Sequence, residues 1–123
     1  MCLICYFSLR VYSAVMLPND CPLYVALRVI SGKWKPLILH ELKTGTLRYG
    51  QLQRRIPQAS KKVLTSQLRQ LERDGIVERR VHAESILRTQ YTLTQYGKTM
   101  RPALLELTRW GRKHRLRGMS VSD

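Results

Sequence analysis

Apolar residues recur at helical spacing through most of the chain and change to strand spacing near residue 76. Leu64, Leu68 and Leu71 are spaced four and three positions apart, so a helix over 60–75 would carry all three on one face. The basic and hydroxyl side chains of this segment fall on the opposite face: Lys62, Ser66, Arg69 and Arg73. The pattern predicts a helix with a buried leucine seam and an outward cationic surface.

Three shorter helices precede this segment, because proline and glycine divide the apolar pattern into short pieces. Asp20 or Cys21 can cap the first helix, and Pro22 is tolerated in its first turn, where the missing N–H has no helical partner. We expect helices at 22–30, 34–43 and 48–56, with a very short strand at 46–47.

A β-hairpin and a long helix complete the chain. Apolar and polar residues alternate over 76–81 and again over 89–94, and the two segments bracket 82–88. Thr94 is a good cap for a last helix over about 95–115, and Pro102 inside it predicts a kink or a restart.

This order predicts a mostly α fold with a small β-hairpin, a winged helix-turn-helix. In that arrangement the helix at 60–75 enters the major groove and the hairpin lies along the neighbouring backbone or minor groove. We expect the domain at 19–116, a flexible tail at 117–123, and at 1–18 an extension or a misassigned start, with Met16 as the alternative first residue.

The net charge of the chain indicates which kind of partner it binds. Twenty-two Lys and Arg against eight Asp and Glu give a charge of +14, which favours a polyanion, most commonly nucleic acid. An anionic membrane would need a basic helix with an exposed apolar face, and we expect the core to use these apolar faces. Arg10 interrupts the apolar leader, and three sparse cysteines suit the reducing cytoplasm, so we expect neither anchor nor disulfide framework.

The candidate DNA contacts lie on the predicted helix-turn-helix and its hairpin. An Arg can bind guanine through two hydrogen bonds, and a helix N-terminus favours phosphate. The candidates for contact with the DNA groove are Ser60, Lys61, Lys62, Thr65, Ser66 and Arg69. Arg48 and Arg55 are candidates for contact with phosphate, and Arg88 on the hairpin is a candidate for contact with the DNA backbone. The plain alternative is a solvated basic face. Lys33 and Lys35, beside Trp34, are further phosphate candidates, whereas alternation separates Arg79 from Arg80.

Four segments resemble the HxlR-type helix-turn-helix family of bacterial transcription regulators, which are related in shape to the MarR group. They are CPLYVALRVISGKWKPLILHEL, LRYGQLQRRIP, SKKVLTSQLRQLERDGIVERRV and YTLTQYGKTMRPALLELTRWG. The resemblance implies a homodimer, formed through the first and last helices, that binds an inverted-repeat operator in double-stranded DNA. The hairpin departs from the family, with Ser85, Ile86 and Leu87 where members commonly have Val-Pro-Pro.

Cys21 is the one candidate for reactive chemistry. The dipole of the first helix would stabilise its thiolate, and the resemblance implies a sensor of oxidants or other small molecules at this position. The alternative is an inert cap. Cys2 and Cys5 form a C-x-x-C without the further ligands that zinc needs, so we expect no metal or cofactor.

No catalytic motif is visible, because acids and histidines are scattered and no phosphate-binding glycine loop occurs. The sequence therefore predicts not an enzyme but a dimeric, sequence-specific DNA-binding regulator, with thiol control through Cys21 as a possible addition. The alternatives are a winged-helix protein-interaction module and a nonspecific nucleic-acid binder.

Overall fold

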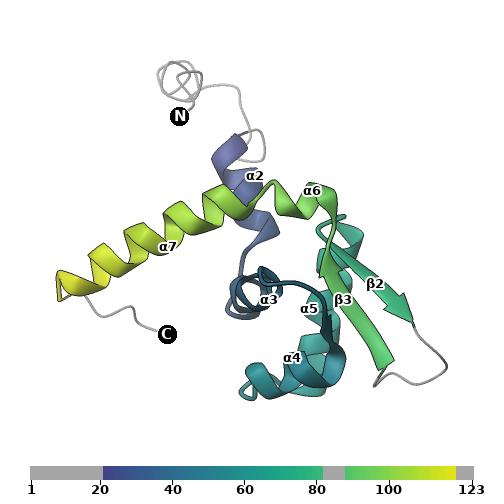
Figure 1. Ribbon diagram of the computed structural model, residues 1–123. Helices are drawn as coiled ribbons and strands as arrows, with labels where there is room; N and C mark the ends of the chain where they lie inside the picture. Colours follow the sequence, from purple (N-terminus) through teal and green to yellow (C-terminus); the bar gives the residue numbers. More distant parts are fainter. Residues whose placement is uncertain (1–20, 82–87, 119–123) are drawn as a thin grey trace.

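The computed structural model describes residues 21–81 and 88–118, and the expectations for the leader, the hairpin tip and the last five residues lie outside these ranges. Figure 1 shows the elements in their spatial arrangement. In chain order they are α2 (Pro22–Val29), α3 (Trp34–Leu42), β1 (Leu47–Arg48), α4 (Tyr49–Arg55), α5 (Lys61–Arg73), β2 (Val77–Val81), β3 (Thr89–Leu93), α6 (Gln95–Lys98) and α7 (Arg101–Leu116). The mostly α fold class is confirmed.

The sheet has three antiparallel strands in the order β1-β3-β2. The hairpin pairs Val77 with Leu93 and Val81 with Thr89, as the alternating pattern predicts. The short strand β1 lies one residue later than expected and pairs Leu47 with Tyr91. Because β1 pairs with β3 and directly precedes α4, it fixes the position of α4 relative to the hairpin.

The core lies between α3, α4, α5 and the inner face of this sheet. Leu64, Leu68 and Leu71 of α5 have no exposed surface, which confirms the predicted seam. They belong to one cluster with Ile38 of α3 and Leu52 of α4. Burial of each such side chain contributes about 1.5–3 kcal/mol. The seam therefore fixes which side of α5 faces outward.

The last helix is interrupted between α6 and α7, which confirms the restart expected near Pro102. Thr94 caps α6, because its Oγ1 accepts a hydrogen bond from the Gly97 amide at 2.8 Å. The same hydroxyl donates to the Gly75 carbonyl at 2.6 Å. A Cβ on Gly97 would lie 2.2 Å from the Ile76 carbonyl oxygen, so only glycine allows α6 to approach the sheet this closely.

The helices α2 and α7 differ from the rest because neither contains a buried residue. Figure 1 shows α7 extending away from the body, on the side opposite the hairpin. Leu105, Leu107 and Trp110 of this basic helix are 52%, 48% and 64% exposed. Leu104 packs against the core cluster, but the expectation that the core uses the apolar faces of the basic helices is wrong for the rest of α7, and Trp110 is not a core residue. No described helix is both long and apolar enough to cross a bilayer.

Candidate nucleic-acid interface

The outward face of α5 carries the cationic surface predicted from its sequence. Lys62, Ser66 and Arg69 are exposed, and Lys61 and Arg73 extend the same surface toward the two ends of the helix. With Thr65, these residues line an open hollow of about 560 Å³. The structure therefore brings most of the selected groove residues together on one face, turned away from the leucine seam.

Hydrogen bonds fix the start of α5 and engage two of the selected hydroxyl groups. Ser60 is the N-cap, and its Oγ accepts from the Val63 amide at 3.2 Å. Tyr49 of α4 donates its hydroxyl to the Lys61 carbonyl at 3.2 Å, and Thr65 donates to the Tyr49 hydroxyl oxygen at 3.3 Å. Ser60 thus caps α5, and Thr65 with the Lys61 carbonyl joins α5 to α4, while the neighbouring Lys62 and Ser66 are exposed.

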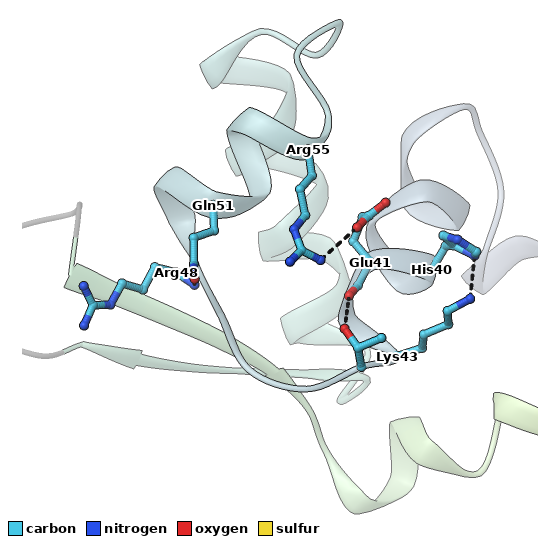
Figure 2. A network of polar contacts seen from close by, with 7 residues as sticks. His40, Glu41, Lys43, Arg48, Gln51 and Arg55 are labelled. Carbon is cyan, nitrogen blue, oxygen red and sulfur yellow. Dashed lines mark hydrogen bonds and ion pairs between the residues drawn. The ribbon is translucent and has the colours of Figure 1, made fainter.

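The two arginines selected for phosphate contact differ in their surroundings, because the side chain of only one of them takes part in a polar network between α3 and α4. Arg55 Nη1 donates to Glu41 Oε2 at 3.2 Å, and this pair links the two helices (Figure 2). Arg48 differs, because its guanidinium points away from this network (Figure 2). Its backbone amide donates to Gln51 Oε1 at 2.8 Å, at the start of α4. Arg48 therefore remains available to a phosphate, while Arg55 already has a carboxylate partner.

The sheet register places further basic residues on its outer face. Arg48 of β1 and Arg80 of β2 both pair with Gln90 of β3, so the three side chains form one row across the sheet. Arg80 Nε also lies 3.2 Å from Glu78 Oε1. Sequence reasoning missed this row, because a row is visible only once the register is known. Arg88, the hairpin residue expected to contact the DNA backbone, is exposed and lies just before β3.

Arg79 lies on the inner side, which confirms that it and Arg80 occupy opposite faces. Its register partner is the buried Tyr91, and its Nε lies 3.7 Å from Glu72 Oε2 of α5. Burial raises the pKa of the Tyr91 phenol above its ordinary value, and the nearby Arg79 charge opposes this shift in part. Arg79 therefore joins the hairpin to α5 from the inside.

The two lysines beside Trp34 have different surroundings. Lys33 is exposed, and its Nζ lies 5.1 Å from the centre of the Trp34 ring. Lys35 is only 6% exposed. The expectation that Lys35 contacts phosphate of bound DNA is wrong, because the first turn of α3 directs this position inward. Trp34 itself is half-buried and packs against the core.

Cys21 occupies the predicted N-cap of α2, with extended backbone angles of φ −73 and ψ 120. Its side chain is half-buried, forms no capping hydrogen bond, and is in no disulfide within the described ranges. Over residues 21–81 and 88–118, no three His, Cys, Asp or Glu side chains gather into a metal-binding group. The thiol thus remains the chemical candidate that the sequence indicated.

Known proteins are similar to this chain in both sequence and arrangement. The family model described as HxlR-like helix-turn-helix matches residues 29–119. The HTH-type transcriptional regulator YdeP of Bacillus subtilis (strain 168) is 37% identical over 97 residues, which cover 79% of this chain and 76% of YdeP.

Three solved structures extend this similarity. The redox regulator HypR in its reduced form has a TM-score of 0.74 at 36% identity, covering 80% of this chain and 100% of that one. A MarR-family regulator from Porphyromonas gingivalis W83 has a TM-score of 0.71 at 30% identity, over 80% and 96%. Quinone-bound YodB from B. subtilis has 0.65 at 32%, over 76% and 99%. The matched length, the shared MarR-like winged-helix fold and the relatives' common role show that this chain belongs to the HxlR-like helix-turn-helix family of transcriptional regulators.

Proposed function

We propose that this chain regulates transcription in the cytoplasm by binding a specific operator in double-stranded DNA. The observation that carries the proposal is the outward cationic face of α5, held by a fully buried leucine seam on its other side. Lys62, Ser66 and Arg69 would contact base edges or phosphates in the major groove. Arg48 and Arg88 would contact the backbone on either side of that groove.

We further propose that the operator is an inverted repeat bound by a homodimer. The exposed apolar side chains of α2 and α7 support a second copy as the partner, because both helices project apolar surface that the protomer leaves uncovered. Leu23 and Leu27 of α2 are 65% and 45% exposed. Two recognition helices on such a dimer would meet successive major grooves about 34 Å apart.

Selection from a pool of random duplexes tests these proposals. The expected product is a short inverted repeat with half-sites about 10 base pairs apart, which unrelated DNA displaces only in large excess. Equal competition by unrelated DNA would instead favour a nonspecific nucleic-acid binder. Absence of any DNA binding would favour a protein-interaction module. Sedimentation of the complex checks the stoichiometry of two protomers per site.

We also propose that Cys21 makes operator binding sensitive to oxidants or electrophiles. Its position at the N-terminus of α2 supports this, because the helix dipole stabilises a thiolate there. Two structural neighbours, a redox regulator and a quinone-bound regulator, support the same class of signal.

The test compares operator affinity with and without diamide. Cys21→Ser should abolish the effect of diamide, whereas Cys2→Ser and Cys5→Ser, the matched controls, should retain it. An unchanged diamide effect in Cys21→Ser would contradict the sensor proposal and leave the DNA-binding proposal intact.

A further inference from the structure

The start of α7 joins this helix to the body, which comprises the elements from α3 to β3. Met100, just before α7, and Leu104 within it pack against the core cluster. Arg101, the first residue of α7, donates a hydrogen bond from Nη2 to the Lys43 carbonyl at 2.8 Å. Across residues 21–81 and 88–118, no other hydrogen bond or ion pair joins α7 to the body. Arg101 therefore supplies the directional contact between the two.

The acceptor of this hydrogen bond lies at the C-terminal end of α3, where backbone carbonyls lack partners within the helix. The carbonyls of Glu41 and Leu42 are satisfied by the residues that directly follow α3, at 3.3 and 3.2 Å. The Lys43 carbonyl instead accepts from Arg101, which lies 58 positions away in the sequence. The end of α3 is thus completed by a residue of α7.

Local electrostatics disfavour an arginine at the first position of α7. The N-terminal end of a helix carries the positive end of the helix dipole, which repels a cation, whereas the C-terminal end attracts one. The first turn of α7 contains no acid that could compensate. The Arg101 guanidinium reaches from the unfavourable end of α7 to the favourable end of α3. The contact between the two helices therefore accounts for the residue type at this position.

The last turn of α3 is also linked to α5, through α4. Glu41 of α3 accepts a hydrogen bond from Arg55 of α4 at 3.2 Å (Figure 2). Tyr49 of α4 donates its hydroxyl to the Lys61 carbonyl of α5 at 3.2 Å. Polar contacts therefore connect the first residue of α7 with the first residue of the helix that carries the cationic face.

A small change of angle at the start of α7 has a large effect at its far end. The 16 residues of α7 span about 24 Å. A rotation of about 10° about the first turn moves the far end by about 4 Å, compared with a rise of about 3.4 Å per base pair of DNA. Apolar contacts such as that of Leu104 have no preferred direction and tolerate such a rotation, whereas a misaligned hydrogen bond weakens steeply.

We infer that Arg101 is a positioning residue, which fixes the angle of α7 on the body and thereby sets the spacing of the operator half-sites. The inference rests on the proposed dimer and operator, and it names the residue that determines this part of their specificity. In a dimer joined through α7, the distance between the two copies of α5 depends on this angle. With Arg101 in place the angle is narrowly defined and one spacing is preferred. Without its hydrogen bond, the two copies of α5 reach several spacings.

The first test measures the angle without DNA, so its outcome is independent of the proposed function. Nitroxide labels are attached through Arg54→Cys on α4 and Lys113→Cys on α7, both at exposed positions, after the three natural cysteines are replaced by serine. The labelled chain is diluted with excess unlabelled chain, so that a dimer carries one labelled copy. Double electron–electron resonance should give one narrow distribution of distances between the two labels when Arg101 is present.

Two substitutions at the exposed Arg101 isolate the hydrogen bond. Arg101→Met removes the donor but keeps a long stem, and should broaden the distance distribution about twofold or more. Arg101→Lys keeps a donor and the charge, and should restore a distribution close to that of the wild type. Arg112→Met, the matched control on α7, removes the same charge and should leave the distribution unchanged. An equally narrow distribution in Arg101→Met and wild type would overturn the inference.

The second test adds DNA. The ligands are inverted repeats whose half-site spacing changes in steps of one base pair, together with a duplex that carries a single half-site. We expect the wild type to prefer one spacing by about tenfold or more, and Arg101→Met to retain a preference of about threefold or less. Arg101→Lys should restore the preference. Affinity for the single half-site should be the same in all three proteins.

The single half-site distinguishes the possible failures. Weaker half-site binding by Arg101→Met would overturn the positioning role, because the substitution would then disturb the cationic face of α5 itself. An unchanged spacing preference in Arg101→Met would overturn the inference and leave the proposed function intact. A wild-type chain that binds neither the half-site nor the repeats would overturn the proposed function, whereas the distance measurement would still decide whether Arg101 fixes α7 on the body.

Discussion

The body from α3 to β3 and the two helices α2 and α7 use apolar residues in different ways. Every hydrophobic side chain that is buried lies between Ile38 and Leu93 in the described chain. The helices α2 and α7 contain no buried residue and expose Leu23, Leu107 and Trp110. The body therefore holds the whole of the buried core, whereas α2 and α7 add only partly buried residues such as Val29 and Leu104 and leave most of their apolar surface exposed.

This difference suits the two proposed roles of the chain, in which the body supports α5 and the helices α2 and α7 associate with a second copy. The body can hold α5 rigidly, and rigid support of its cationic face would favour specific contacts with the proposed operator. The exposed apolar surface of α2 and α7 would become stabilising only on association, at about 25 cal/mol per Å² removed from water. Stability of the body and affinity between copies should consequently respond to different substitutions.

The largest expected effect is on the core of the body. Leu68→Ala should lower the free energy of unfolding by about 2–5 kcal/mol, because it removes a fully buried side chain from the seam. Leu116→Ala is the matched control, since Leu116 is 86% exposed, and should change it by less than about 0.5 kcal/mol. Urea unfolding of the two variants measures both. Similar losses would contradict the contrast between body and α7.

Two glycines provide the next comparison. Gly97→Ala should destabilise the chain by about 1–3 kcal/mol, because its Cβ would lie 2.2 Å from the Ile76 carbonyl oxygen. Gly111→Ala in α7 meets no atom within 4 Å and should stabilise the helix by about 0.5–1 kcal/mol. Thermal unfolding should move in opposite directions for the two variants, and a shared direction would refute this account of the α6 contact.

Association should depend on α7. Trp110 is 64% exposed and stacks on His114 with ring centres 4.9 Å apart, so it offers a large preordered apolar surface. Trp110→Ala should raise the dimer dissociation constant at least tenfold, equivalent to about 1.4 kcal/mol. Arg112→Ala, on the same helix, should change it much less. Sedimentation velocity measures both, and equal effects would argue against the apolar surface of α7 as the interface.

The smallest expected effect is confined to alkaline pH. Burial raises the pKa of Tyr91 above its ordinary value of 10.0, so the folded state disfavours the phenolate. The resulting stability is fully present below pH 10 and is lost as pH rises through the higher folded pKa. Tyr91→Phe should reduce the fall in unfolding free energy above pH 10. An equally steep fall in Tyr91→Phe and wild type would exclude Tyr91 as its cause.

Much of this molecule follows from local pattern. Periodicity predicts the α5 seam, the hairpin and the restart near Pro102, because each depends on residues close in sequence. The outward placement of Lys62 and Arg69 follows from the same helical geometry. The local pattern is therefore sufficient to predict the outward cationic face of α5.

Other features depend on contacts between distant segments. The row formed by Arg48, Gln90 and Arg80 requires the strand register, and the Arg55–Glu41 pair requires the packing of α4 on α3. Lys35 follows an exposed lysine and a tryptophan in the sequence, yet the fold buries it, and it lines a hollow together with residues of α2 and α5. Sequence pattern alone cannot distinguish an apolar face that packs within the protomer from one that remains exposed, as on α7.

The central claim is that the cationic face of α5 binds the operator, and its most direct measurement is the salt dependence of operator affinity. The double variant Lys62→Ala/Arg69→Ala should lose at least about 1–3 kcal/mol of binding free energy and show a shallower dependence on salt. The control Arg112→Ala/Lys113→Ala removes the same charge from α7 and should keep nearly wild-type affinity. Equal losses in the two double variants would contradict the claim, because net charge alone would then account for binding.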